Sequence, residues 1–219
     1  MAGKLFLSWT RPTQEQQQNC TAIAGGFNYN TTLQGTSALS AEDKILQDNL
    51  AKNGFFINRA RVLLGTGSIT YALAKSAVLT WRQFGLKWAF VDPQTPVEKG
   101  RRFCVCVNEF FPWVMMPLQI AYVADASIQP PSAAGIKDSF GFGSGTLQGH
   151  LLVGEERFSV QWDEDDRVWY EIFSFSKPAH IISAIGLPYV RFRQKCFARQ
   201  SAEAMVKHVS AQKPKIEDI

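Results

Sequence analysis

The stretch RFSVQWDEDDRVWYEIFSFSKPAHIISAIGLPYVRFRQKCFARQSAEAMVKHVSA, residues 157–211, decides the fold of this chain. It begins with alternating polar and apolar side chains, which is the two-residue period of a strand. The acidic segment 163–167 then turns the chain into a second strand, so the two strands form a predicted hairpin. From Lys177 onward the period becomes helical, with a break at Gly186 and Pro188.

Further elements are predicted upstream of this hairpin. Residues 55–64 alternate as a strand, and residues 67–85 have apolar side chains at four-residue steps, which is typical of a helix. More strand-like segments, separated by turn residues, follow this helix; they cover 86–92, 101–109, 113–125 and 140–146. The run of strands without intervening helices indicates an antiparallel, meandering sheet.

One strand, one helix, about six further strands and a long closing helix is the order of the helix-grip (Bet v 1/START-like) fold. The sequence therefore predicts an α+β protein whose curved antiparallel sheet, of six to seven strands, wraps the C-terminal helix and leaves a cavity. Alternating βαβ units, which a doubly wound nucleotide-binding domain needs, do not occur in the pattern. We expect a polar N-terminal arm with a short helix over residues 1–53, one helix-grip domain over 54–210 and a polar tail over 211–219.

The N-terminal arm is rich in Gln, Asn and Thr, as extended segments are. Its aromatic side chains indicate that it packs against the domain; they are Phe6, Trp9, Phe27 and Tyr29. Residues 40–54 predict the short amphipathic helix of this arm, with Ser40 as its N-cap and Gly54 as its stop.

Glycine is concentrated in FGFGSGTLQGHLLVGEERF, residues 140–158. A phosphate-binding loop needs either G-x-G-x-x-G between a strand and a helix or Gly-Lys-Ser/Thr, and this stretch has neither. At the two-residue period of a strand, Gly141, Gly143 and Gly145 share one face, which is bare of side chains. Either the closing helix packs against this bare face, or an apolar ligand shares the space with that helix.

His150, Trp169 and Glu171 complete the candidate ligand cavity, because Glu171 lies between Trp169 and Phe173 on a predicted strand and could face the cavity. Together with Glu155 and Glu156, His150 and Glu171 could form a buried acid–base group. The alternative is that Glu171 pairs with an arginine. Neither G-x-S-x-G nor H-E-x-x-H occurs, so we expect no catalytic residues and a protein that is not an enzyme.

The segment YVRFRQKCFAR, residues 189–199, carries only positive charges. Its cations are Arg191, Arg193, Lys195 and Arg199. Three of them lie at four-residue steps and would form a basic stripe along a helix. The stripe is either a solvated helix face or a surface for anionic lipid headgroups, which Trp113 would extend.

Composition limits the classes of partner and cofactor. A formal net charge of +4 lacks the concentrated basic footprint of a nucleic-acid-binding protein. Cys104 and Cys106 share a strand face without the spacing of a zinc site, so we expect buried, reduced thiols and no metal. We also expect no cofactor. The chain has no 18-residue apolar run, and we expect no cleavable signal or transit peptide.

Three long segments, 90–123, 141–160 and 168–180, resemble a family of bacteria and plants that is defined as a domain of unknown function. LFLSWTRPTQEQQQ, residues 5–18, and NGFFINRARVLLGTG, residues 53–67, resemble its plant branch. The resemblance implies association with the chloroplast outer envelope and a role as a cation-selective channel. It implies no catalytic residues.

Two hypotheses follow. In the first, the protein is a non-enzymatic, cytosol-facing component of the chloroplast outer envelope that conducts cations as an assembly of several copies. In the alternative, it is a soluble helix-grip module that binds an apolar small molecule or lipid between the sheet and the C-terminal helix.

Overall fold

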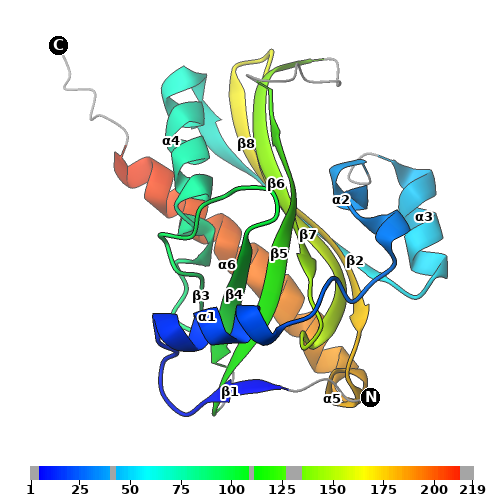
Figure 1. Cartoon of the computed structure of the whole chain (residues 1–219). Coiled ribbons are helices and arrows are strands. Elements are labelled where there is room, and N and C mark those ends of the chain that lie inside the picture. Colours follow the sequence, from blue (N-terminus) through cyan, green and yellow to red (C-terminus); the bar gives the residue numbers. More distant parts are fainter. Residues whose placement is uncertain (1–4, 40–42, 109–110, 127–134, 213–219) are drawn as a thin grey trace.

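A curved antiparallel sheet forms the centre of the protein (Figure 1). The structure is a computed structural model and describes residues 5–39, 43–108, 111–126 and 135–212. Seven strands follow the spatial order β2-β8-β7-β6-β5-β4-β3. They are β2 (Phe56–Thr66), β3 (Ala89–Phe90), β4 (Arg102–Asn108), β5 (Trp113–Asp125), β6 (Ile136–Thr146), β7 (Leu152–Asp163) and β8 (Arg167–Pro178). A short additional strand, β1 (Phe6–Ser8), pairs with the start of β5.

Two helical segments cover the concave face of this sheet (Figure 1). The connection from β2 to β3 contains α4 (Gly67–Leu79) and the 3-10 turn η2 (Arg82–Phe84). The chain closes with α5 (Ile181–Ile185) and α6 (Leu187–Gln212), which are separated at the predicted break. This order of elements and strands confirms the predicted helix-grip architecture.

The hairpin of β7 and β8 shows why the opening stretch determines the fold. Val160 lies opposite Tyr170, and Phe158 opposite Ile172, in the antiparallel register. These four side chains are buried and belong to one apolar cluster with residues of α4 and α6. The apolar half of the strand alternation therefore faces the helices.

Aromatic rings fill the middle of the space between sheet and α6. The ring centroid of Trp81 lies 5.1 Å from that of Phe142, and Phe84 lies 5.6 Å from Phe158 and 4.9 Å from Phe197. Edge-to-face and tilted contacts at these distances are favourable for aromatic pairs. Any ligand space along α6 therefore lies toward one end of the helix and not at its centre.

The N-terminal arm crosses the opposite, convex face of the sheet (Figure 1). It contains more helix than the sequence predicted: α1 (Gln14–Ile23), the 3-10 turn η1 (Thr31–Leu33), α2 (Thr36–Leu39) and α3 (Lys44–Lys52). Helix α1 begins with a reciprocal capping box between Thr13 and Gln16. Asp43 caps α3, whereas the predicted cap Ser40 lies outside the described residues.

Three cysteines lie in a buried apolar cluster under α1. Cys20 packs with Cys104, Cys106 and Met115. Burial raises the pKa of the Cys106 thiol to about 12, so this thiol is protonated at neutral pH. The cluster attaches α1 to the convex face of β4 and β5. Helix α6 continues to Gln212, two residues into the predicted polar tail, and residues 213–219 lie outside the described part of the chain.

Candidate functional site

The three strand glycines face the N-terminal arm and not the C-terminal helix. A Cβ atom at Gly143 would lie 2.2 Å from the Tyr122 ring, and one at Gly145 would lie 2.1 Å from the Tyr29 hydroxyl oxygen. Gly141 is on the same face, where a Cβ would lie 2.9 Å from that of Ser159. The prediction that the bare face receives the closing helix, or a ligand beside it, is wrong, because tyrosine rings occupy the bare face.

Beside this glycine face, the arm binds a buried carboxylate. Glu155 of β7 accepts hydrogen bonds from the Tyr29 hydroxyl at 2.7 Å, from the Gly35 amide at 2.7 Å and from the Ser37 amide at 3.1 Å. Burial, followed by the charge of Glu155, raises the pKa of Tyr29 and keeps its hydroxyl a donor. Glu155 therefore fixes the arm to the sheet.

Glu171 of β8 is part of the same interface. Its carboxylate forms ion pairs with Arg59, at 2.5 Å, and with Arg157. Arg157 also donates to the Ala38 carbonyl oxygen at 3.2 Å. The arginine-paired alternative therefore holds for Glu171. The hypothesis of one acid–base group is wrong. Glu155 and Glu171 face the arm, whereas Glu156 faces the opposite side of the sheet.

Trp169 and His150 also lie apart and do not line the single cavity under α6 that the sequence predicted. Trp169 is on the convex face, where its indole donates to Asp163 at 3.0 Å and the Arg61 guanidinium lies 4.4 Å from its ring centroid. His150 is buried in the connection from β6 to β7 and accepts a hydrogen bond at Nδ1 from the Leu152 amide at 2.9 Å. Burial lowers the pKa of His150 to about 4.

Sequence reasoning missed a row of polar side chains on the concave face. Four neighbouring strands contribute one residue each: Ser144 pairs in register with Glu156, Glu156 with Ser174, and Ser174 with Asn58. Phe158, two residues after Glu156 on the same face, belongs to the aromatic core. The row therefore marks the end of that core.

Glu156 is the chemically unusual member of the polar row. Among the residues that the structure describes, its carboxyl has neither a hydrogen bond nor an ion pair. Burial raises its pKa to about 8, so at neutral pH the carboxyl is mostly protonated. Its charged form would also raise the pKa of Tyr170, whose hydroxyl is already hydrogen-bonded to Ser201 of α6 at 2.9 Å.

Helix α6 closes over the polar row with further polar contacts. Gln194 donates to the Ser176 hydroxyl at 2.7 Å, and its backbone oxygen accepts from Asn58 at 3.2 Å. Apolar side chains of β4 and β5 lie on the same concave face and are half-buried; they are Val105, Val114 and Met116. The end of the concave face under the first half of α6 is thus lined by hydroxyls, one carboxyl and aliphatic groups.

The sequence carried a signal for this site. Because side chains alternate along a strand, Glu156 must share the face of Phe158 and Val160, which is the apolar face. An acid in that position is either paired or functional. Ser174 repeats the pattern behind Tyr170 and Ile172.

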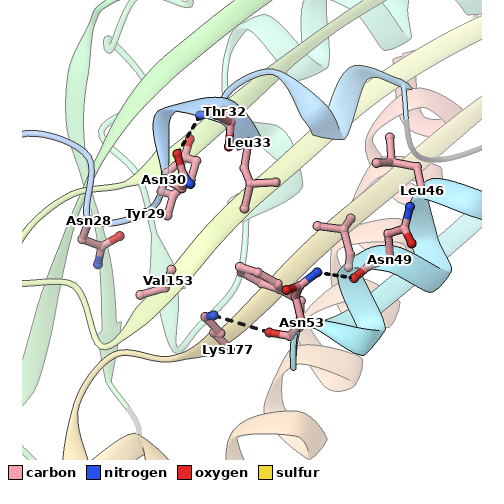
Figure 2. Close-up of a pocket in the computed structure, with 12 residues that line it drawn as sticks. Asn28, Tyr29, Asn30, Thr32, Leu33, Leu46, Asn49, Asn53, Val153 and Lys177 are labelled. Carbon is pink, nitrogen blue, oxygen red and sulfur yellow. Dashed lines mark hydrogen bonds between the residues drawn. The ribbon is translucent and has the colours of Figure 1, made fainter.

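A separate groove of about 510 Å³ opens on the convex side, between the arm, α3 and the ends of β7 and β8 (Figure 2). Figure 2 shows asparagine side chains around its rim and Lys177 beside them. These amides are used within the protein: Asn28 donates to the Leu152 oxygen at 3.0 Å, and Asn30 accepts from the Thr32 amide at 3.0 Å. The groove is therefore a seam that holds the arm, and its polar groups are largely engaged.

The predicted basic stripe lies along the first half of α6. Arg191 and Lys195 are exposed, and their charged groups lie 5.2 and 6.0 Å from the Phe56 ring centroid. Arg199, further along, lies 3.8 Å from Glu203. The helices within the described residues include none that is both long and apolar enough to cross a bilayer.

The other two predicted surface residues are placed differently. Arg193 stacks with its guanidinium 3.9 Å from the Trp88 ring centroid. Trp113 is half-buried and packs with Phe90 at 5.5 Å, with the Arg11 guanidinium 5.9 Å from its ring centroid. Its ring is therefore engaged with β3 and the arm.

Curated relatives occur in three kingdoms of life. The chain is 52% identical over 207 residues to the UPF0548 protein of Arabidopsis thaliana, covering 94% of this chain and 99% of that protein. It is 29% identical to a UPF0548 protein of Dictyostelium discoideum, covering 83% and 85%, and 31% identical to one of Deinococcus radiodurans, covering 68% and 76%.

Two solved structures are similar at TM-scores below 0.5. A hypothetical protein from Helicobacter pylori has a TM-score of 0.46 and 12% identity, covering 71% of this chain and 87% of its own. Ara h 8.0201 has a TM-score of 0.42 and 9% identity, covering 73% and 100%. The fold assignment therefore rests on the strand order and helix placement described above.

The family described as Domain of unknown function (DUF1990) matches residues 41–204, which include every strand of the main sheet and most of α6. Together with the relatives, this match shows that the chain belongs to the DUF1990 (UPF0548) family, which has plant, amoeba and bacterial members.

Proposed function

We propose that this protein binds a small, largely apolar molecule between the concave face of the sheet and the first half of α6. The observation that carries the proposal is Glu156: a half-buried carboxyl on the apolar face of the sheet, with a raised pKa and no hydrogen-bonding partner in the described part of the chain. A ligand that covers this carboxyl would remove it from water, so such a ligand must supply a hydrogen-bonding partner in return.

The protonation state of Glu156 defines the polar end of the ligand. A carboxyl with a pKa of about 8 is protonated at neutral pH, and it both donates and accepts a hydrogen bond. Ser144 and Ser174, its neighbours in register, add hydroxyl groups that adapt to either role. A neutral hydroxyl or carbonyl group on the ligand fits this set.

The apolar end of the ligand would lie against β4 and β5. Val105, Val114 and Met116 are half-buried on the concave face, so burying them completely under a ligand is favourable. The thioether of Met116 adapts to ligands of different shape. Phe197 of α6 packs against the aromatic core and would close the site toward its centre.

A fluorescence titration with N-phenyl-1-naphthylamine, a neutral apolar probe, tests this function. We expect emission to rise with the wild type and affinity to fall about tenfold or more in Met116→Asp, which places a charge on the apolar lining. Glu164→Gln, in the exposed turn between β7 and β8, is the matched control and leaves affinity unchanged.

Nuclear magnetic resonance locates the probe. Amide shifts confined to β4, β5, β7 and the first half of α6 support the proposal. Equal probe binding by wild type and Met116→Asp, or shifts confined to the groove between the arm and α3, would overturn it.

Location in the cell stays a separate proposal. The resemblance of residues 5–18 and 53–67 to the plant branch motivates a place on the chloroplast outer envelope, where several copies would conduct cations. Fractionation of leaf cells with antibodies to this chain tests the location, and planar-bilayer recording tests conduction. Absence from purified envelopes, or a bilayer without current after protein addition, would rule out the respective part.

A further inference from the structure

Large apolar side chains are exposed along α5 and the start of α6. The exposed fractions are 68% for Ile181, 79% for Ile185, 40% for Tyr189 and 59% for Phe192. Ile181 and Ile185 are four residues apart within α5, and Tyr189 and Phe192 are three apart within α6, so each pair lies on one side of its own helix. These four residues are called the α5–α6 stripe below.

The backbone holds this stripe in position although the helix is interrupted. The Val190 amide donates to the Gly186 carbonyl oxygen at 2.9 Å, so α6 begins immediately after the break. On the inner side of α5, Ser183 is buried and donates to the Leu151 carbonyl oxygen at 2.7 Å. Ile181 and Ile185 therefore point away from the sheet, because the opposite side of α5 is fixed to it, and the exposure of Tyr189 and Phe192 continues the stripe onto α6.

Positive charge accompanies the stripe, and negative charge does not. Between Glu171 and Glu203 the chain has no Asp or Glu. Arg191 and Lys195, both exposed, border Phe192 in the helix and lie near the Phe56 ring, which fixes them beside the stripe. Apolar side chains flanked by cations on one helix side are the pattern of segments that lie in a membrane interface.

We infer that the α5–α6 stripe docks on an anionic lipid bilayer, with its apolar side chains at the level of the acyl-chain boundary and Arg191 and Lys195 at the lipid headgroups. Charge complementarity selects this occupant. A second copy of the chain packing stripe to stripe about a two-fold axis would bring the same cations against each other. Anionic lipids instead neutralise both cations.

This inference is independent of the proposed ligand site. Glu156 lies on the sheet beneath α6, whereas the stripe lies on the outer side of α5 and α6. Loss of lipid binding with retained binding of N-phenyl-1-naphthylamine would separate the two, as would the reverse result.

Co-sedimentation with lipid vesicles tests the docking surface. Vesicles of phosphatidylcholine with about 20% phosphatidylglycerol should bind the wild type, and pure phosphatidylcholine vesicles should bind it far more weakly. Binding should also fall in about 0.5 M NaCl, because salt screens exposed charges.

Paired substitutions separate charge from apolar contact. Arg191→Gln with Lys195→Gln should weaken partitioning onto the anionic vesicles about 30-fold, because each cation near an anionic surface strengthens binding by somewhat less than about tenfold. Ile185→Ser with Phe192→Ser should weaken it about tenfold or more. The matched control is Lys44→Gln with Lys52→Gln on α3, which lies across the sheet from α6 (Figure 1) and should leave partitioning within about twofold.

All of these side chains are exposed, so the variants should unfold at the temperature of the wild type. Equal binding to both kinds of vesicle, no binding to either, or an equal loss in the control variant would each overturn the inference. A dimer in light scattering that Ile185→Ser dissolves would identify a second copy as the occupant and overturn it as well.

Discussion

Glu155 and Glu156 are neighbours in sequence and lie on opposite faces of one strand, with opposite hydrogen-bonding environments. Glu155 accepts three hydrogen bonds from the arm, whereas Glu156 has none in the described part of the chain. Glu155 fixes the arm to the sheet, whereas Glu156 faces the helices without such a partner. This contrast places the structural side of the sheet under the arm and the candidate binding side under α6.

Replacing Glu156 by Gln should remove a pH dependence of stability. The folded protein holds the Glu156 proton up to pH about 8, while the unfolded chain releases it near its ordinary pKa of 4.5. The folded state binds more protons in this window, so its stability falls as pH rises through it. In guanidinium unfolding between pH 5 and 8, we expect the wild type to lose about 2 to 4 kcal/mol more than Glu156→Gln. Parallel profiles for the two proteins would contradict this.

His150 should produce the opposite dependence at lower pH. Its pKa is about 4 in the folded state and 6.5 in the unfolded chain, so acidification through this window favours unfolding. His150→Asn retains an acceptor for the Leu152 amide without titrating. The variant should lose about 2 kcal/mol less than the wild type between pH 6.5 and 4.5 in urea unfolding. Equal losses of stability by the wild type and His150→Asn over this interval would refute the burial effect.

Gly145→Ala should loosen the arm. Its Cβ would lie 2.1 Å from the Tyr29 hydroxyl and 2.8 Å from the Phe27 ring, and both side chains would have to move. Such overpacking costs about 1 to 3 kcal/mol. Limited proteolysis within the arm should therefore become faster. Gly26→Ala is the control, since a Cβ there meets no atom within 4 Å. Equal cleavage rates in the two variants would exclude this close approach.

Arg157→Leu should destabilise the protein more than a surface charge deletion does. It leaves the buried Glu171 carboxylate with Arg59 and removes the contact to the Ala38 oxygen, at a cost of about 3 kcal/mol or more. The control Arg199→Gln breaks an exposed pair with Glu203 and should cost about 0.5 kcal/mol or less. Adding Glu171→Leu to Arg157→Leu should recover part of the loss. Denaturant midpoints measure all three, and no recovery in the double variant would argue against the ion-pair account.

The strand and helix pattern could be predicted from the sequence because it depends on local periodicity. The hairpin of β7 and β8, the break before α6 and the single-face placement of Gly141, Gly143 and Gly145 all follow from it. Which layer covers that face could not be predicted, since periodicity separates two faces without saying what lies on each.

The partners of the glycines come from distant segments and from an irregular strand. A register shift between Ile120 and Tyr122 turns the Tyr122 ring onto the convex face opposite Gly143. Tyr29 reaches Gly145 across more than a hundred residues of chain. The position of Glu156 on the apolar face, by contrast, could be predicted from the sequence, because it lies two residues from Phe158 on the same strand.

The inner side of α6 contacts the polar row and Tyr170 through hydrogen bonds, and its outer side carries the exposed residues of the α5–α6 stripe. If the α5–α6 stripe docks on a bilayer as inferred, a molecule leaving the concave face beside this helix would emerge next to the lipid and not into bulk water. Exchange of such a cargo would proceed by collision with the acceptor membrane, and its rate would rise in proportion to the concentration of acceptor vesicles.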